Sequence, residues 1–155
     1  MKTGYAAKTE AAVALAAGVA KSILGVRSNA AFGMDWIDYE IGFDGVTASA
    51  VPVLVELCYC TWATNPPATN STAVTIQTAY GRAVASGMTA ARNWTAEPTV
   101  VTPLREYLLT PNGGLVIARF ARDRTWDTAL NEGFLIRCTA PAIVNVRATM
   151  GFERA

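Results

Sequence analysis

Histidine is absent from this chain of 155 residues, so the side chain that most often serves as a general base near neutral pH is missing. Nucleophiles activated by histidine are therefore excluded, together with the histidine ligands of common zinc sites. A pair of carboxylates can still support catalysis, but no specific pair stands out in the sequence. We therefore expect a protein that is not an enzyme and that carries no cofactor.

Charge is scarce and balanced. Charged residues make up 16% of the chain, against about 25% in typical globular proteins, and the formal net charge is +1. Proteins that bind nucleic acid gain affinity by neutralising phosphates with lysine and arginine. The composition therefore predicts no nucleic-acid partner, and a surface rich in alanine and threonine suits packing against other protein chains.

Long apolar runs are missing too, although hydrophobic residues reach 52% of the chain. The apolar stretch Val51–Val55 is interrupted by Pro52 and ends at Glu56, whereas a membrane helix needs roughly 20 apolar residues. The first residues also lack the apolar segment of a secretory signal. We therefore expect no membrane association, and synthesis in a cytoplasm.

The three cysteines are Cys58, Cys60 and Cys138. In a strand, residues i and i+2 lie on one face about 6.6–7 Å apart, which is too far for an easy disulfide between Cys58 and Cys60. Zinc sites usually use cysteine pairs with wider spacing. We expect three free, buried thiols, because free cysteine packs as a small hydrophobe.

The clearest pattern that is present is strict alternation near the end of the chain. Apolar residues occupy every second position from Val144 to Phe152, and mixed residues fill the positions between them. A period of two is typical of a half-buried β-strand. The same alternation runs through Asp35–Phe43, which ends at the turn-forming pair Asp44–Gly45, and through Ala50–Trp62.

Four further segments are expected to be strands: Ala73–Tyr80, Thr99–Leu109, Leu115–Phe120 and Glu132–Cys138. Two segments are loops or turns by composition, Thr64–Thr72 and Pro111–Gly114, and Gly81–Ala91 fits either a loop or one turn of helix.

The segment Glu10–Val26 is ambiguous, because its apolar residues fit both a helix and a strand. Alanine favours the helix, whereas Gly18 and Gly25 count against a long one. We favour two short strands joined near Gly18.

Together the segments amount to about eight or nine strands, a series typical of an all-β antiparallel sandwich or a jelly-roll-like barrel. No repeat, linker or second domain is visible. We therefore expect a flexible N-terminal arm over residues 1–9 and a single β-sandwich domain over residues 10–155.

Candidate contact residues come from a charged excursion late in the chain. It holds Arg122 and Arg124 around Trp126, and a large aromatic residue in a polar loop is a typical interface anchor. The predicted contacts to other protein chains are these three residues together with two residues of the arm and one loop-end tryptophan: Tyr5, Lys8, Trp62, Arg122, Arg124 and Trp126.

The sequence offers two further candidate sites on the surface. Trp62 and Trp94 lie near loop ends, and a pair of exposed tryptophans can stack on sugars. A cation site at Asp35, Asp38 and Asp44 is disfavoured, because Asp35 and Asp38 have opposite parity on a strand and should not converge.

Three segments together resemble a family of small bacteriophage structural proteins found among virion genes. They are Ile41–Leu57 (IGFDGVTASAVPVLVEL), Trp94–Pro98 (WTAEP) and Ala140–Glu153 (APAIVNVRATMGFE). The resemblance covers about residues 10–153. It implies a β-sandwich unit of a phage particle, located in the virion, and it carries no catalytic motif.

The resemblance leads us to expect a capsid decoration or cement protein. It would bind the major capsid protein or other virion proteins as a homo-oligomer, with a trimer favoured, and would stabilise the head by mass action. The alternative is a tail or fibre component with a carbohydrate-binding surface formed by Trp62 and Trp94.

Overall fold

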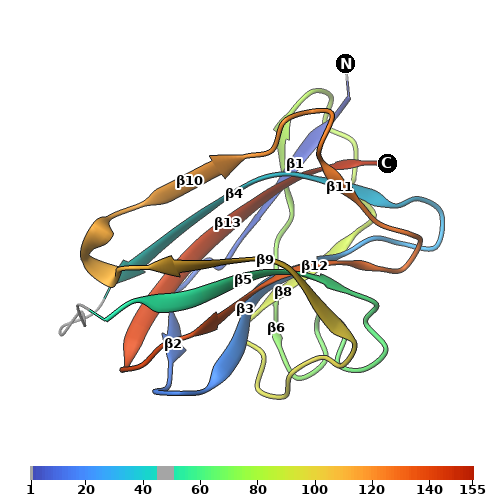
Figure 1. Cartoon of the computed structure of the whole chain (residues 1–155). Coiled ribbons are helices and arrows are strands. Elements are labelled where there is room, and N and C mark those ends of the chain that lie inside the picture. Colours follow the sequence, from blue (N-terminus) through green and yellow to red (C-terminus); the bar gives the residue numbers. More distant parts are fainter. Residues whose placement is uncertain (1, 45–50) are drawn as a thin grey trace.

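The computed structural model describes residues 2–44 and 51–155. These residues form two antiparallel β-sheets that pack face to face, which confirms the expected all-β class and the sandwich (Figure 1). Helix in the described residues is limited to one short 3-10 turn, η1 (Pro111–Gly113).

One sheet has seven strands, in the order β10-β4-β13-β1-β7, and two short strands pair beside this path, β11 with β4 and β2 with β13. Its strands are β1 (Gly4–Lys8), β2 (Val13–Leu15), β4 (Met34–Asp44), β7 (Gln77–Tyr80), β10 (Val116–Arg119), β11 (Trp126–Asp127) and β13 (Val144–Arg154).

The other sheet has six strands, in the order β6-β8-β3-β12-β5-β9. Its strands are β3 (Ala20–Arg27), β5 (Val53–Cys60), β6 (Thr72–Val74), β8 (Thr89–Arg92), β9 (Val101–Leu109) and β12 (Gly133–Thr139). The chain crosses between the sheets at both sides of the sandwich, from β9 to β10 through η1 and from β6 directly to β7.

The main core lies between the sheets, and the alternation near the chain end predicts its centre correctly. The apolar residues of β13, from Val144 to Phe152, are between 0% and 5% exposed. Strand β13 pairs with β4 on one side and with β1 on the other. Facing them, Phe134 of β12 packs against Trp36 of β4 with ring centroids 5.3 Å apart. This interleaving of the inner faces is what a β-sandwich requires.

The expected flexible arm is wrong, because residues 4–8 form strand β1 inside the seven-stranded sheet. Strand β1 pairs with β13 over its whole length and with β7 on its other side. Tyr5 is 2% exposed and stacks on Phe152. The arm lacks a long apolar pattern of its own, but its alternation matches a partner strand that lies far along the chain.

The segment Glu10–Val26 contains two strands, as favoured from its glycines. Strands β2 and β3 lie in different sheets, and Gly18 between them has a positive φ of 71°. That conformation suits glycine, which has no Cβ to clash. The turn at Gly18 therefore takes the chain from one layer of the sandwich to the other.

The described residues contain thirteen strands, so the expected eight or nine was too low. The expected strand Ala73–Tyr80 is divided into β6 and β7, which belong to different sheets, and Gly81–Ala91 leads into β8. Strand β5 occupies the middle of the expected Ala50–Trp62. Ala50 and the expected turn residue Gly45 lie outside the described residues.

Candidate interaction surface

The two sheets present very different outer faces. On the outside of the six-stranded sheet, a second apolar cluster is buried beneath loops 61–71 and 93–100, and we call it the tryptophan cap. Its members are Cys58, Cys60, Trp62, Ala91, Trp94 and Leu135. The rings of Trp62 and Trp94 stack on each other, with centroids 5.6 Å apart and planes 20° apart.

This stacking corrects two predictions from the sequence. Trp62 is 4% exposed and Trp94 is 2% exposed, so neither ring is available to a sugar or to a neighbouring chain. The expected carbohydrate platform is therefore wrong, and so is the expected contact through Trp62. The two rings instead lie over Gly25 of β3, where a Cβ atom would stand 2.8 Å from Trp62 and 3.0 Å from Trp94.

Hydrogen bonds between the loops fix the tryptophan cap. The indole nitrogen of Trp94 donates to the Asn65 carbonyl at 2.9 Å, and the Asn65 amide donates to the Glu97 carbonyl at 3.0 Å. The Glu97 carboxylate in turn accepts the backbone N–H of Ser22 at 2.7 Å and also its hydroxyl. The loops are thereby tied to β3 of the sheet that they cover.

The thiols follow the prediction, since all three cysteines are free and buried. Burial raises the pKa of Cys58 to about 12 and the pKa of Cys60 to about 11, and it also raises the pKa of Cys138. A thiol that stays protonated at neutral pH is a poor nucleophile and a poor metal ligand. The cysteines are therefore packing residues.

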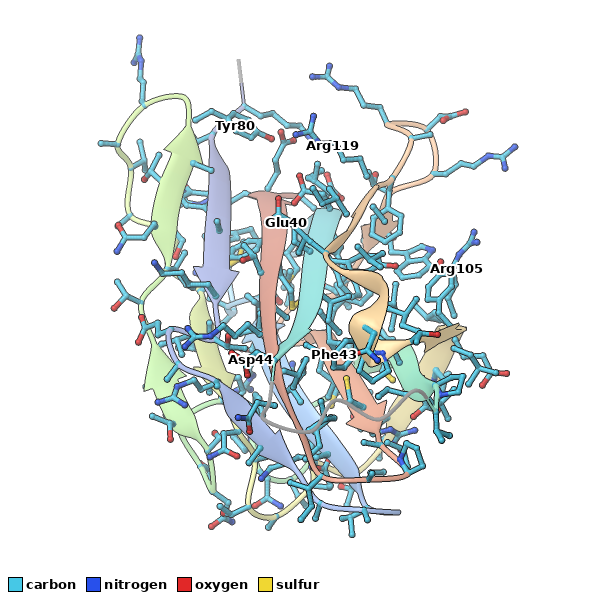
Figure 2. All side chains as sticks on the ribbon, turned by 90° about the vertical axis from the view of Figure 1, so that its left-hand side faces the viewer. Glu40, Phe43, Asp44, Tyr80, Arg105 and Arg119 are labelled. Atoms are coloured by element: carbon cyan, nitrogen blue, oxygen red, sulfur yellow. The ribbon has the colours of Figure 1, made fainter. Side chains whose placement is uncertain are left out.

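The outside of the seven-stranded sheet is different, and we call it the open face. Neither apolar cluster of the described residues lies on it. Figure 2 labels three residues of the open face, Glu40, Asp44 and Arg119. It combines small residues with charges of both signs: Ala6 and Lys8 of β1, Asp38, Glu40, Gly42 and Asp44 of β4, Arg119 of β10, and Arg147, Gly151 and Glu153 of β13.

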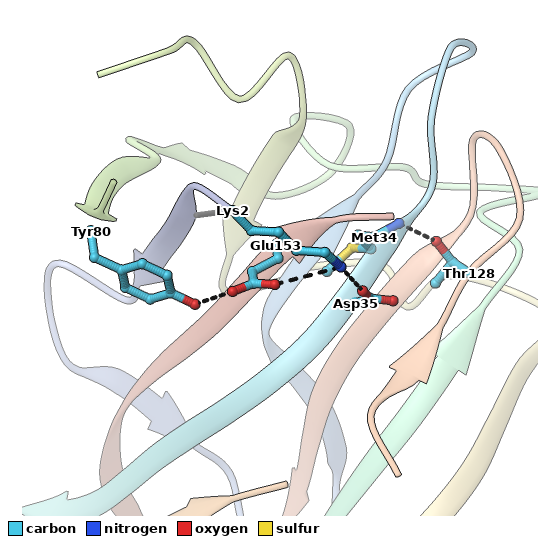
Figure 3. A network of polar contacts seen from close by, with 6 residues as sticks. All are labelled: Lys2, Met34, Asp35, Tyr80, Thr128 and Glu153. Atoms are coloured by element: carbon cyan, nitrogen blue, oxygen red, sulfur yellow. Dashed lines mark hydrogen bonds and ion pairs between the residues drawn. The ribbon is translucent and has the colours of Figure 1, made fainter. Parts of the chain in front are cut away.

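A groove of about 280 Å³ lies at one end of the open face, beside Lys2 and Arg122. Lys2 forms ion pairs with Asp35 at 3.2 Å and with Glu153 at 3.7 Å, and Tyr80 donates a hydrogen bond to Glu153 (Figure 3). Burial, followed by the hydrogen bond and charge of Glu153, raises the pKa of Tyr80 to about 12. The cluster ties the start of the chain to its last strand.

A β-bulge in β4 corrects the parity argument for the acidic residues. Trp36 pairs with Phe152 and Asp38 pairs with Gly151, so Ile37 is an extra residue on β4. Asp35 and Asp38 therefore both reach the outer side of the sheet, while Trp36 and Tyr39 both face the core. In the described residues, no group of three or more potential ligands is close enough to hold a metal ion.

Asp38 is a half-buried carboxylate of the open face. Burial raises its pKa, against the opposing effects of the nearby Arg119 charge and a hydrogen bond from the Gly151 backbone. A Cβ atom on Gly151 would lie 2.1 Å from the Asp38 carboxylate. Glycine at position 151 therefore makes room for this carboxylate to lie flat on β13.

A larger groove of about 490 Å³ lies at the other end of the open face. Lys8, Glu40 and Arg147 line it, and Arg147 forms an exposed ion pair with Asp44 at 3.6 Å. Its wall also includes Leu115, which is 60% exposed. Both signs of charge and an exposed apolar side chain therefore meet in one hollow.

The six predicted contact residues differ in exposure, since some are exposed and others are buried. Lys8 and Arg122 line the two grooves of the open face, and Arg124 is exposed in the same loop as Arg122. Tyr5 is buried in the core, so a contact through its side chain is ruled out, as it is for Trp62. The contact roles of Lys8, Arg122 and Arg124 stay predictions.

Trp126 is half-buried and does not stand free in a polar loop. Its ring packs against Phe120 at 4.8 Å and against Trp36 at 5.7 Å, and the Arg105 guanidinium lies 5.8 Å from it. The Trp126 ring is therefore only partly exposed to a partner. Two further groove residues, Glu40 and Arg147, were not predicted from the sequence. The alternation of β4 and β13 nevertheless places both side chains on the outer side of the sheet.

Comparisons with protein-family models, with curated proteins and with solved structures found no match. The described part of the chain also contains no helix of the length and apolar character needed to cross a membrane.

Proposed function

We propose that this protein is a non-enzymatic structural component of a bacteriophage particle, a capsid decoration or cement protein that binds the major capsid protein through the open face. Two arguments support the proposal. The first is the resemblance of three segments to small virion proteins. The second is the contrast between a face that is covered by the chain's own loops and a face that offers grooves and charges.

The observation that carries the proposal is the larger groove. It places Lys8 and Arg147 beside Glu40 and Asp44, next to the exposed Leu115. Interfaces between folded proteins combine an apolar centre with a polar rim, and charges at the rim govern orientation and association rate. A partner that supplies complementary charges would replace water around this hollow.

The mechanism is stabilisation by mass action. A protein that binds the assembled shell more tightly than free capsid subunits shifts the equilibrium toward the shell. The sandwich itself needs no chemistry for this task. It needs a rigid face, which the long pairing of β13 with β4 provides.

The test is binding to capsids of the phage that encodes this chain, after the decoration layer has been removed. Arg147→Glu should weaken binding about tenfold or more, because it reverses a charge inside the groove. Arg82→Glu is the matched control, since Arg82 is exposed in the loop after β7 and does not line the groove. Equal binding by both variants would contradict docking through this groove.

Cryo-electron microscopy of intact particles tests the location. Density on the outer capsid surface, with the seven-stranded sheet turned toward the shell, is the expected result. Density confined to the tail or its fibres would overturn the capsid proposal in favour of a tail component.

A further inference from the structure

Strand β10 is a regular, open edge of the seven-stranded sheet. The edge strand β9 contains Pro103 and a register irregularity opposite Leu57–Cys58, and the edge strand β7 has an irregular register with β1. Proline and bulges are among the devices by which proteins prevent strand-to-strand association. Strand β10 pairs regularly with β4 and contains neither device.

The backbone of β10 turns its free hydrogen-bonding groups outward at two residues. The N–H of Phe120 donates to the Ile37 carbonyl on β4 at 2.8 Å. Because backbone direction alternates along an antiparallel strand, the N–H and C=O groups of Ile117 and Arg119 point away from β4. In the described residues, no other strand pairs with this edge.

The side chains beside this edge are apolar or carry unpaired charge. Ile117 is 56% exposed. Glu40 lies opposite Ile117 across the β4–β10 pair, and Arg119 lies opposite Asp38. Neither Glu40 nor Arg119 forms an ion pair with another described residue, although Arg119 is near enough to lower the pKa of Asp38. One charge of each sign is thus left over along the edge.

We propose that two copies of this chain join through β10, antiparallel across a two-fold axis at Ala118, so that their seven-stranded sheets form one continuous sheet. In this register Ile117 faces the partner's Arg119, and the pair can exchange both backbone hydrogen bonds. Strands are about 4.8 Å apart, so Glu40 and the partner's Arg119 lie in one row with Cα atoms about 10 Å apart. Their long side chains can meet above Ile117.

Charge complementarity favours a second copy of this chain as the partner at this edge. A two-fold contact is self-complementary, so the leftover acid and the leftover base each find a counterpart, twice in the interface. Centring the axis on Ile117 would instead place Arg119 opposite the partner's Leu115. The two-fold contact gives a dimer in place of the trimer expected from the sequence.

The test uses two charge-reversal variants of the full-length protein and light scattering of the free protein. Glu40→Lys places two cations at each contact, and Arg119→Glu places two anions there. Each variant alone should shift the mass from two chains to one, through a Kd raised at least tenfold. Mixing the two variants should restore the two-chain mass, because only a mixed pair brings opposite charges together at both contacts.

Ile117→Pro gives a second readout that is independent of charge. It removes an N–H that points away from β4, so the pairing of β10 with β4 should persist while the dimer is lost. Leu108→Ser, at an exposed position on β9, is the matched control and should remain dimeric. Circular dichroism verifies that each variant is folded.

Three results would overturn the proposal: a one-chain mass for the wild-type protein, a three-chain mass that Ile117→Pro does not change, or no recovery on mixing. All of these readouts need no capsid. A dimer that fails to bind particles would therefore contradict the proposed function alone, and a monomer that binds particles would contradict the dimer alone.

Discussion

The outer faces of the two sheets differ in how far other parts of the chain cover them. The six-stranded sheet buries Cys58, Cys60 and Leu135 under two stacked tryptophans from its own loops. The seven-stranded sheet leaves small residues, ion pairs and two grooves on its outside. A sandwich normally needs one apolar face per sheet, so the tryptophan cap is a second core outside the first.

The two faces differ because one is covered by loops of the chain and the other is not covered by the described residues. Covering a sheet with loops costs backbone entropy, and the buried tryptophan area offsets this cost because aromatic side chains dominate core energetics. The loops around Asn65 and Glu97 are therefore structural parts. The open face has no comparable cover from the described residues and can change its charges without loss of the core.

The largest expected effect on stability comes from removing one tryptophan of the tryptophan cap. We expect Trp94→Ala to lower the free energy of unfolding by about 3–5 kcal/mol, the usual cost of a large aromatic-to-alanine change in a core. Urea denaturation measures this loss. Val100→Ala is the control in the same loop, since Val100 is 58% exposed, and it should stay within about 0.5 kcal/mol of the wild type.

Thiol labelling in Trp94→Ala localises the damage. Cys58 and Cys60 should react faster with iodoacetamide than in the wild type, while Cys138 in the main core should stay protected. Equal acceleration at all three cysteines would mean that the tryptophan cap and the main core unfold together, and the idea of a separate outer core would be wrong.

Two glycines give a matched pair of substitutions, one under each face. In Gly25→Ala the new methyl group would meet both tryptophan rings and the Cβ of Leu135 at 3.1 Å. Overpacking of this kind costs about 1–3 kcal/mol. In Gly151→Ala the atoms nearest to the new methyl group belong to the Asp38 carboxylate, which can rotate toward solvent, so we expect a smaller loss by urea denaturation.

The outcome that would contradict this comparison is a larger loss for Gly151→Ala than for Gly25→Ala. It would show that the Asp38 carboxylate is held as rigidly as the indole rings. The open face would then be as tightly packed as the tryptophan cap, despite its exposure.

The alternating strands could be predicted from sequence because their signal is local. Strand β13 shows its buried face in every second residue, and the glycine at position 18 marks the junction of β2 and β3. The all-β class followed from such segments. Each of these features depends on residues within one strand or one turn.

The rest depends on contacts between distant segments. Strand β1 is recognisable only through its pairing with β13, and the stacking of Trp62 on Trp94 joins two loops across the outside of a sheet. The bulge at Ile37 turns Trp36 into the core, although simple alternation places it outside with Asp38. One inserted residue thus changed the prediction for the acidic cluster.

Ion pairs under the two faces should also differ in strength. Arg137 holds Glu56 with two hydrogen bonds, of 2.8 Å and 3.1 Å, and its side chain is 23% exposed. Lys2 is 63% exposed in its pairs with Asp35 and Glu153. We expect Arg137→Ala to cost about 1.5–3 kcal/mol and Lys2→Ala about 0–1 kcal/mol.

Salt separates these two ion pairs further. The Lys2 contribution should vanish when urea denaturation is repeated at high NaCl, because exposed charges are screened, while the Arg137 contribution should largely persist. Equal salt sensitivity of the two variants would mean that the capped sheet shields its ion pair no better than the open face does.

The smallest expected effect is a pH dependence at Asp38, which is half-buried on the open face. Its pKa in the folded state is raised above 3.8, so the folded protein binds a proton there more readily than the unfolded chain. The stability that this group contributes is present below pH 3.8 and is lost as the pH rises through the raised pKa.

Asp38→Asn should therefore gain stability relative to the wild type as the pH rises from about 3.5 to 7. The Gly151 N–H can still donate to the asparagine side-chain oxygen, so the hydrogen bond survives the substitution. Asp123→Asn, in the exposed loop that holds Arg122, controls for the loss of one carboxylate. A stability difference between Asp38→Asn and wild type that shrinks as the pH rises would mean that the Arg119 charge outweighs burial. Arg119 would then be committed within its own subunit and would be less available to the Glu40 of a partner.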